Sequence, residues 1–382
     1  MTTINKSAKI LVIGGSSLDT LTIKGKDHSS PGGAGLYTAL AAAKSGADVT
    51  LLAPFPSPVP ATLLEFSAHV KWIGPEVSPD ELPRFHIVHA NGETKYKRSF
   101  FGAEGAMTAE DLPDNFSEYD LVHLVPLGNT IKQLEFINIC RKRNAELISA
   151  GTGKPMIEQE PELVKYVIQA SDIFFMNEEE ANAVFPENTE FRFATGKHIF
   201  VTKGKNGASV FLGEYQYLLD PKQVNVLDPT GAGDAFCGAT ISGIAQGEHP
   251  VKAAMSASVL ASEVIKAVGP EKLYIKSKIR TNKINARVLV NHDQVQQTAK
   301  LISGFEAEKP YNFIDSTLPP LTHPLTVEYF FVTVLQQFSF WSSREKHYHL
   351  PLISEIGGNE LKGAFYLFMA YKQKLDEDPN FF

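Results

Sequence analysis

Residues 228–236 read Asp-Pro-Thr-Gly-Ala-Gly-Asp-Ala-Phe, and this stretch decides the fold class of the chain. The residues before it, 223–227, alternate between polar and apolar side chains, which predicts a strand. The residues after it, 235–244, are small and apolar, as in a closely packed helix. A strand, a glycine turn and a helix in this order are typical of an α/β fold.

The glycine turn has the composition of an anion-binding site. A helix that begins near Gly231 directs the free N–H groups of Gly231, Ala232 and Gly233 toward one point, where the helix dipole also favours negative charge. Asp234 then stands in the first helical turn beside that point. A carboxylate in this position suits the removal of a proton from a hydroxyl that attacks a phosphoryl group. An ordinary helix-capping acid is the alternative interpretation.

This stretch resembles the second signature of the ribokinase-like (PfkB) family of sugar and nucleoside kinases. Four further segments resemble motifs of that family, in the family's order. They are the predicted strand at 10–15 with Asp19, the glycine pair at 31–35, the Asn-Glu-Glu-Glu motif at 177–180 and the loop at 201–208. The resemblance covers about residues 8–270. It implies a doubly wound, mainly parallel sheet with helices on both faces and a small β lid.

The resemblance also implies a role for each matched residue. Asp234 is expected to be the catalytic base, with the Gly231, Ala232 and Gly233 amides around the moving phosphoryl group. Contacts with the substrate are expected from Asp19, Gly32, Gly33, Tyr37 and Arg98. Contacts with ATP and Mg²⁺ are expected from Asn177, Glu180, Thr202, Lys203, Gly204 and Asp228.

Two of these roles involve cations. Glu180 is expected to reach Mg²⁺ through water, because that ion keeps much of its hydration shell. Asp228 is expected to organise the loop and a nearby monovalent cation such as K⁺. Simple turn or surface positions are the alternatives for Asp19, Asp228, Lys203 and Arg98.

One position departs from the family pattern. Many sugar kinases of that family carry an asparagine shortly after the paired glycines, in contact with the sugar, whereas this chain has Leu36 and Tyr37 there. A tyrosine can stack on a ring or a base, but it cannot replace the paired donor and acceptor of an amide. This departure puts a ribose-like or fructose-like acceptor in doubt and leaves the choice between sugar and nucleoside open.

Apolar runs of strand length alternate with helical patterns, which favours a parallel, doubly wound sheet. The predicted strands are 9–15, 48–53, 121–125, 146–149, 172–176, 199–202 and 208–211, and the predicted helices between them are 36–45, 131–143, 160–170 and 178–185. Such sheets bind ligands at the carboxyl ends of their strands, so the motif residues are expected to gather at that edge.

Residues 84–101 form two polar, alternating segments around Asn91-Gly92, which is a strong hairpin signal. A polar hairpin inserted into an α/β chain predicts a lid. In the resembled family such a lid closes over the sugar and contributes to dimer contacts, so a homodimer through the lid is expected.

The regular alternation ends near residue 270. We expect a kinase domain over residues 1–270, a connector over 271–320 with one helix near 293–301, and a helical C-terminal extension over 321–382. That extension faintly resembles part of the queuosine-salvage glycosylases, through Phe-Ser-Phe-Trp at 338–341 and the glycines of 358–363. Val334 stands where that family has an acid, so no active residue is carried over.

Composition narrows the possible partners and compartment. The net charge of −7 argues against a general nucleic-acid binder. Cys140 and Cys237 give no disulfide framework or zinc spacing, which suits a reducing cytoplasm. The N-terminus lacks a signal-peptide pattern, and no apolar run approaches the ~20 residues that span a bilayer. No P-loop motif occurs.

The sequence therefore predicts a cytoplasmic, ATP-dependent kinase that phosphorylates a hydroxyl of a small sugar or nucleoside. Two alternatives stay open. One is a sensor that binds a sugar or nucleoside without chemistry, and the other is a nucleoside-salvage fusion whose C-terminal part contacts a modified nucleoside or a partner.

Overall fold

The computed structural model describes residues 7–90, 93–185, 197–213, 215–274 and 286–289. Contacts divide the chain into two units. The first comprises Met1–Thr189, His198–Val210 and Leu219–Ile284, and the second comprises Glu190–Lys197, Phe211–Leu218 and Asn285–Phe382. All motif residues of the predicted site lie in the first unit. The predicted connector, the predicted C-terminal extension and its glycosylase-like motif lie almost entirely outside the described residues.

The core of the first unit is a parallel sheet. Its strands follow the order β13-β12-β11-β10-β1-β4-β6, and each neighbouring pair is parallel. Their side chains are almost all buried, because helices cover the sheet. The strands are β1 (Lys9–Ile13), β4 (Asp48–Leu52), β6 (Lys71–Ile73), β10 (Leu121–Leu124), β11 (Ile148–Gly151), β12 (Ile173–Asn177) and β13 (His198–Thr202).

Strand β14 (Ala208–Leu212) follows β13 in the strand order. The second unit holds most of β15 (Tyr215–Leu219) and β16 (Ala286–Leu289), which are neighbours in that order. Two short strands of the first unit, β5 (Phe55–Pro56) and β7 (Glu76–Val77), pair separately, and α2 (Leu64–Ser67) lies between them in sequence.

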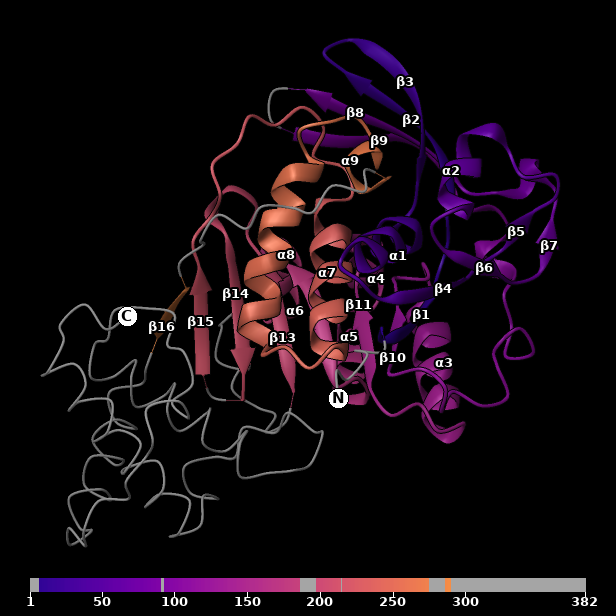
Figure 1. Cartoon of the computed structure of the whole chain (residues 1–382). Coiled ribbons are helices and arrows are strands. Elements are labelled where there is room, and N and C mark those ends of the chain that lie inside the picture. The colour runs from indigo at the N-terminus through magenta and orange to yellow at the C-terminus, as the bar shows by residue number, and fades with distance from the viewer. Residues whose placement is uncertain (1–6, 91–92, 186–196, 214, 275–285, 290–382) are drawn as a thin grey trace, which may run out of the picture. The chain divides into compact units, whose positions relative to one another are not determined.

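Helices form two layers on the sheet. One layer, which faces the viewer in Figure 1, contains α1 (Ala34–Lys44), α7 (Ala232–Ala245) and α8 (Pro250–Val264), and α9 (Glu271–Tyr274) follows it. The other contains α3 (Thr130–Lys142), α4 (Lys154–Gln159), α5 (Pro161–Ala170) and α6 (Glu178–Val184). Small residues let the first layer pack closely, since a side chain at Gly238 would overlap the backbone of Thr38 on α1. The predicted doubly wound α/β fold is confirmed.

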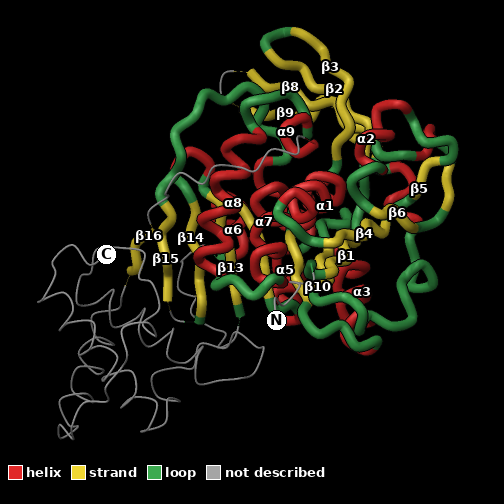
Figure 2. The backbone as a smooth tube through the Cα atoms, in the orientation of Figure 1, coloured by secondary structure: helices red, strands yellow, loops and turns green. Residues whose placement is uncertain are grey.

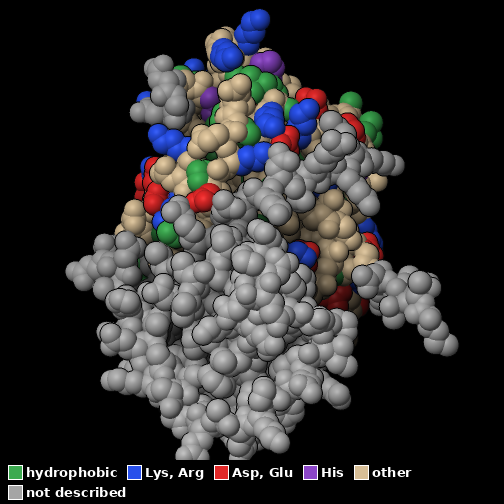
Figure 3. All heavy atoms as spheres, turned by 60° about the vertical axis from the view of Figure 1, so that its left-hand side comes forward, with side chains coloured by type: hydrophobic (Ala, Val, Ile, Leu, Met, Phe, Trp, Pro, Cys, Tyr) green, Lys and Arg blue, Asp and Glu red, His purple; other side chains and the backbone are tan. Residues whose placement is uncertain are grey.

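A second sheet forms the lid. Its order is β3-β2-β8-β9, from β2 (Ser17–Ile23), β3 (Lys26–Gly32), β8 (Arg84–Ala90) and β9 (Glu93–Phe100). It lies at the top of Figure 1 and appears as long yellow strands in Figure 2. In Figure 3, lysine and arginine side chains gather at this upper end, close to hydrophobic and histidine side chains.

The lid is larger than the sequence predicted. The hairpin predicted at 84–101 is present, but β2 and β3 extend it to four strands with a small core of Leu21, Ile23 and Ile87. Asp19 consequently lies inside a lid strand and not in a turn after the first strand.

The predicted strand at 223–227 is wrong. The segment pairs with no strand among the residues that the structure describes, and Val226 is 56% exposed. The Leu227 and Asp228 N–H groups instead donate to the Ile265 carbonyl at the end of α8, at 2.8 and 3.2 Å. The alternating pattern therefore belongs to an extended segment that is hydrogen-bonded to the end of a helix and not to a strand.

In the described part of the chain, no helix is long and apolar enough to cross a membrane. Both cysteines are free and buried.

Candidate active site

Parallel strands bring the motif segments to one edge of the sheet. Strands β1, β12 and β13 run in the same direction, so their carboxyl ends lie at the same edge. Asn177 pairs with Thr202 in register, which places the ends of β12 and β13 side by side. The Gly35 N–H at the start of α1 donates to the Gly15 carbonyl just after β1, at 3.1 Å. Strand pairing and this backbone hydrogen bond thus bring the motif segments together, as predicted.

The start of α7 has the backbone geometry expected of the predicted anion site. Gly231 caps the helix with φ of 71°, a left-handed conformation that favours glycine. Among the described residues, no acceptor is found for the N–H groups of Gly231 and Gly233. The Ala232 N–H donates to the Pro229 carbonyl at 3.3 Å, a long bond. The expectation of three free donors is therefore corrected to two, because the turn uses the Ala232 N–H to close itself.

Asp234 lies half-buried in the first turn of α7. Burial raises the pKa of its carboxyl to about 6, and its own backbone N–H opposes this rise. The helix dipole alone would lower that pKa, so desolvation outweighs the dipole here. A pKa close to neutral suits a general base.

Asn177 and Glu180 cap α6 reciprocally. The Glu180 N–H donates to Asn177 Oδ1 at 2.9 Å, and the Asn177 N–H donates to Glu180 Oε2 at 2.8 Å. Burial raises the pKa of Glu180 to about 7, and the charges of Asp234 and Glu179 add to the rise. Glu180 therefore lies within electrostatic reach of Asp234, and a cation bound between nucleotide phosphates and these acids would relieve their repulsion.

This arrangement fits a metal that takes few protein ligands. In the described residues, no group of three or more His, Cys, Asp or Glu side chains is placed to hold a metal ion. Mg²⁺ typically uses one or two carboxylates together with water and substrate phosphates. Glu180, fixed by Asn177, fits such indirect binding.

The segment after β13 is open on the solvent side. Gly204 has φ of 52°, and within the described ranges no atom lies within 4 Å of the position that a side chain would occupy. Lys203 Nζ lies 3.7 Å from Glu178 Oε1 at the start of α6. Thr202, Lys203 and Gly204 thus line an accessible loop beside the cap of α6.

Asp19 is buried against the first glycine motif. Its Oδ1 accepts a hydrogen bond from the Phe85 N–H of the lid at 3.2 Å, and a side chain at Gly32 would overlap its carboxylate. Burial raises the pKa of Asp19 to about 6, against the effects of the Ser17 hydroxyl and the Phe85 N–H. Gly33 has φ of 95° and packs on Gly15, so both glycines permit close backbone approach.

Tyr37 differs from the expectation. It is 1% exposed, and its ring packs directly against Gly231, where a side chain would collide with it. Burial, followed by the charges of Asp228, Asp19 and Asp234, raises the pKa of its hydroxyl well above the usual value. The expected stacking on substrate is therefore corrected, because α1 packs on α7 and buries this side chain between them.

Arg98 is a residue whose expected contact with the substrate stays a prediction. It lies exposed on β9, opposite His86 in register, and the described part of the chain gives it no hydrogen bond or ion pair.

Three features of the site escaped the sequence analysis. Glu104, in the turn that follows the lid, accepts a hydrogen bond from the Gly15 N–H at 2.8 Å, and burial raises its pKa to about 7. The lid carries a group of aromatic rings, Phe85, Tyr96 and Phe101. His89 contacts the loop at Asp228. The aromatic residues within the predicted hairpin were the only signal available in the sequence.

The aromatic group borders the acids. The Phe85 ring packs edge-on against Tyr96 and Phe101, at centroid distances of 6.1 and 5.6 Å. Tyr96 and Phe101 are 63% and 49% exposed. Desolvation by neighbouring groups, followed by the charges of Asp234 and Asp19, raises the pKa of the Tyr96 hydroxyl. The exposed Tyr96 ring thus lies within electrostatic reach of Asp234 and Asp19.

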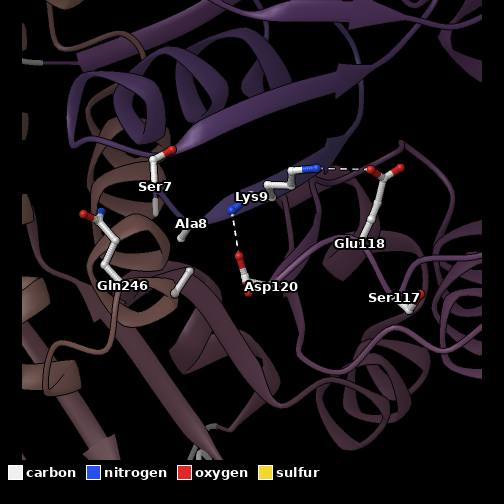
Figure 4. A pocket seen from close by; sticks show the side chains of 8 residues that line it. Ser7, Ala8, Lys9, Ser117, Glu118, Asp120 and Gln246 are labelled. Atoms are coloured by element: carbon white, nitrogen blue, oxygen red, sulfur yellow. Dashed lines mark hydrogen bonds and ion pairs between the residues drawn. The ribbon is translucent and has the colours of Figure 1, made fainter. Parts of the chain in front are cut away.

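A separate cavity of about 350 Å³ lies at the opposite edge of the sheet, where β1 begins and α7 ends (Figure 4). Lys9 Nζ lies 3.4 Å from Glu118 Oε2, and the Lys9 N–H donates to Asp120 Oδ2 at 2.8 Å. Because α7 begins at the anion site and ends here, this cavity is not part of the candidate active site.

Comparison with known proteins agrees with this geometry. Residues 14–276 match the pfkB family carbohydrate kinase, and the chain belongs to that family. A cytidine kinase of Thermococcus kodakarensis is 25% identical over 270 residues, covering 68% of this chain and 97% of the relative. A ribokinase of Bacillus subtilis is 24% identical over 262 residues, covering 63% and 86%.

Solved structures share the fold. Adenosine kinase from Sinorhizobium meliloti superposes with a TM-score of 0.60 at 16% identity, covering 69% of this chain and 96% of that chain. Ribokinase from Cryptococcus neoformans in complex with ADP gives 0.59 at 18% identity, covering 70% and 97%. The chain is therefore a kinase of the class that phosphorylates sugars or nucleosides with ATP.

Proposed function

We propose that this kinase transfers the γ-phosphoryl group of ATP to a hydroxyl of a nucleoside or sugar, with Asp234 as the general base. The observation that carries the proposal is the start of α7. There a half-buried carboxylate with a pKa of about 6 stands in the same helical turn as the N–H groups of Gly231 and Gly233, for which the described part of the chain offers no acceptor. This combination serves proton removal and stabilisation of phosphoryl charge in one place.

Each residue then has a defined task. Asp234 accepts the proton of the attacking hydroxyl, and the two amides stabilise charge on the phosphoryl oxygens. One such donor typically contributes about 3–4 kcal/mol to lowering a barrier. Asp19, beside Gly32 and Gly33, orients the acceptor. The four-stranded lid excludes water, which would otherwise compete with the acceptor for the phosphoryl group.

The nucleotide side is assigned to Thr202, Lys203 and Gly204 beside the cap of α6. Mg²⁺, when bound, neutralises charge on the phosphates. Glu180 would hold it through water, and Asn177 keeps Glu180 in place through the capping box.

The proposal predicts a pH dependence. Asp234 must be ionised to accept a proton, and its pKa is about 6. We expect kcat/KM to rise as the pH increases through about 6 and to level off above it. A pH–rate series with buffers of constant ionic strength measures this. A rate that falls with increasing pH across this range contradicts the assignment.

For the acceptor we favour a nucleoside, because exposed aromatic rings suit a base. We expect Tyr96→Ala to raise KM for nucleosides by about tenfold and to change KM for ribose much less, since one stacking contact is worth roughly 1–3 kcal/mol. Steady-state kinetics with cytidine, adenosine and ribose measure the difference. Tyr166→Ala is the matched control, because Tyr166 is 55% exposed on α5, away from the lid. Equal losses for nucleosides and ribose would point to a sugar site.

Potassium is tested by ion replacement. Both Asp228 oxygens already accept N–H donors, Oδ1 from Thr230 at 2.9 Å and Oδ2 from Gly269 at 2.7 Å. These two hydrogen bonds already fix Asp228 to the loop, and we propose that activity requires no monovalent cation in addition. Exchanging K⁺ for choline at constant ionic strength is expected to change kcat less than about twofold, apart from general salt screening. A loss of most activity would establish the cation that the family resemblance implies.

A thermal-shift screen tests the proposed function itself. Cytidine, adenosine, ribose and fructose are each added with a non-hydrolysable ATP analogue and Mg²⁺. A ligand that binds the folded state raises its melting temperature. Every stabilising ligand is then assayed for phosphorylation. Binding without any phosphorylated product would favour the sensor alternative.

A homodimer through the lid, a cytoplasmic location and a role for residues 321–382 stay predictions. Sedimentation velocity of the full chain and of a lid variant addresses the first.

A further inference from the structure

A histidine of the lid contacts the loop that precedes the anion site. His89 lies near the end of β8, with Nε2 2.8 Å from Thr230 Oγ1 and 3.3 Å from Asp228 Oδ1. Its Nδ1 lies 3.0 Å from Thr94 Oγ1 on β9. The side chains of His89 and Asp228 are 9% and 1% exposed. A lid strand is thus joined to a loop 141 residues further along the chain.

Asp228 connects His89 to the anion site through hydrogen bonds to the neighbouring backbone. It accepts the N–H of Thr230, the residue directly before Gly231, and the N–H of Gly269 after α8. The Ala232 N–H donates to the Pro229 carbonyl and closes the turn. The position of the Gly231 amide therefore depends on a carboxylate and a hydroxyl that His89 contacts.

The contacts of His89 need no charge on the ring. In one neutral tautomer, Nδ1 accepts from the Thr94 hydroxyl, and the Nε2 N–H donates to Asp228 and Thr230. Burial lowers the pKa of His89, while the Asp228 carboxylate opposes that shift. The neutral ring therefore maintains the link at neutral pH.

We propose that His89 is a positioning residue that holds the Asp228–Thr230 loop from the lid and so couples lid closure to the placement of the Gly231 and Gly233 amides. Its effect on catalysis rests on the proposed kinase function, whereas the mechanical link does not. A histidine with a merely local role would stabilise the lid and leave the loop unaffected.

Hydrogen exchange of the full chain tests the link without any substrate. We expect His89→Ala to accelerate amide exchange at least about tenfold in residues 226–236 as well as in the lid, because local opening of both segments becomes easier. His86→Ala is the matched control. His86 lies on the same strand but contacts Thr22 of the lid at 2.9 Å, so this variant should affect the lid alone.

A conservative variant separates the link from general destabilisation. His89→Gln retains a donor that can reach Asp228 or Thr230, and it should restore slow exchange in residues 226–236. If His89→Ala fails to fold, Thr230→Val breaks the same link from the loop side, and we expect faster exchange in the lid. Unchanged exchange of the distant segment in both variants would overturn the proposal.

Kinetics provide the second readout. With any acceptor that the wild type phosphorylates, His89→Ala should lower kcat at least about tenfold, equivalent to about 1.4 kcal/mol, and increase ATP hydrolysis per product formed. His89→Gln should recover most of kcat. If exchange shows the link but the wild type phosphorylates no acceptor, the proposed function fails and the link stands. If kinase activity exists but His89→Ala leaves kcat and the coupling ratio unchanged, the positioning role is refuted.

Discussion

Replacing Asp234 with asparagine is expected to lower kcat by about 10²–10⁴-fold, the range that a positioned general base typically contributes. Asparagine has nearly the same shape but cannot accept the proton of the attacking hydroxyl. The turn at Gly231 and the loop after β13 are left intact, so ATP should bind with nearly unchanged affinity. Steady-state kinetics and calorimetric titration with ATP measure the two quantities separately.

Glu118→Gln is the control for loss of a carboxylate. Glu118 lies at the opposite edge of the sheet in an exposed ion pair with Lys9, which should contribute little to stability (Figure 4). This variant should retain full kcat. A fully active Asp234→Asn enzyme, or an equal loss in both variants, would contradict the role assigned to Asp234.

Replacing Gly231 with alanine should have an effect of similar size for a different reason. The left-handed backbone at φ of 71° disfavours a side chain by roughly 1–2 kcal/mol. The added methyl group would also collide with the buried Tyr37 ring, and overpacking of this kind typically destabilises by about 1–3 kcal/mol. The turn must shift to relieve both, which moves an amide away from the phosphoryl group. We therefore expect a lower melting temperature and a loss in kcat of about 10²-fold or more.

Gly233→Ala is the control, because neither cause of destabilisation applies at this position. Gly233 has no positive φ, and no atom of the described residues lies within 4 Å of the position of its missing side chain. This variant should melt at the wild-type temperature or above, because alanine is the better helix former. Calorimetry and circular dichroism of both variants measure the stability difference. Equal stability of Gly231→Ala and the wild type would show that the turn tolerates a side chain and that the Tyr37 contact is unimportant.

The sheet was predictable because its strands are buried on both faces. Runs such as 9–13 and 121–124 are almost wholly apolar, and helical patterns separate them. The lid strands were harder, since β3 reads Lys-Asp-His-Ser-Ser-Pro-Gly and carries little apolar pattern. At residues 223–227 the sequence predicted a strand that the structure does not contain. The alternation of this segment is typical of a strand, but its hydrogen bonds go to the end of α8, and local patterns do not reveal such partners.

The site was predictable where its chemistry lies in one motif. Asp234 and Gly231 are neighbours in sequence, so the anion site followed from the turn between strand and helix. Contacts between distant segments were not accessible in this way. The burial of Tyr37 against Gly231 follows from close packing of α1 on α7, and the His89–Asp228 contact joins the lid to a loop far along the chain. The elevated pKa of Asp234 likewise depends on burial and not on its position in the helix.

The most direct measurement incubates the full chain with ATP, Mg²⁺ and cytidine, adenosine or ribose, and follows ADP and phosphorylated acceptor by mass spectrometry. The same assay is run on Asp234→Asn. We predict equal amounts of ADP and a phosphomonoester of at least one acceptor for the wild type, and almost none of either for the variant. ADP with free phosphate alone would contradict phosphoryl transfer to an acceptor. The same phosphomonoester at the wild-type rate from the variant would contradict the role of Asp234 as general base.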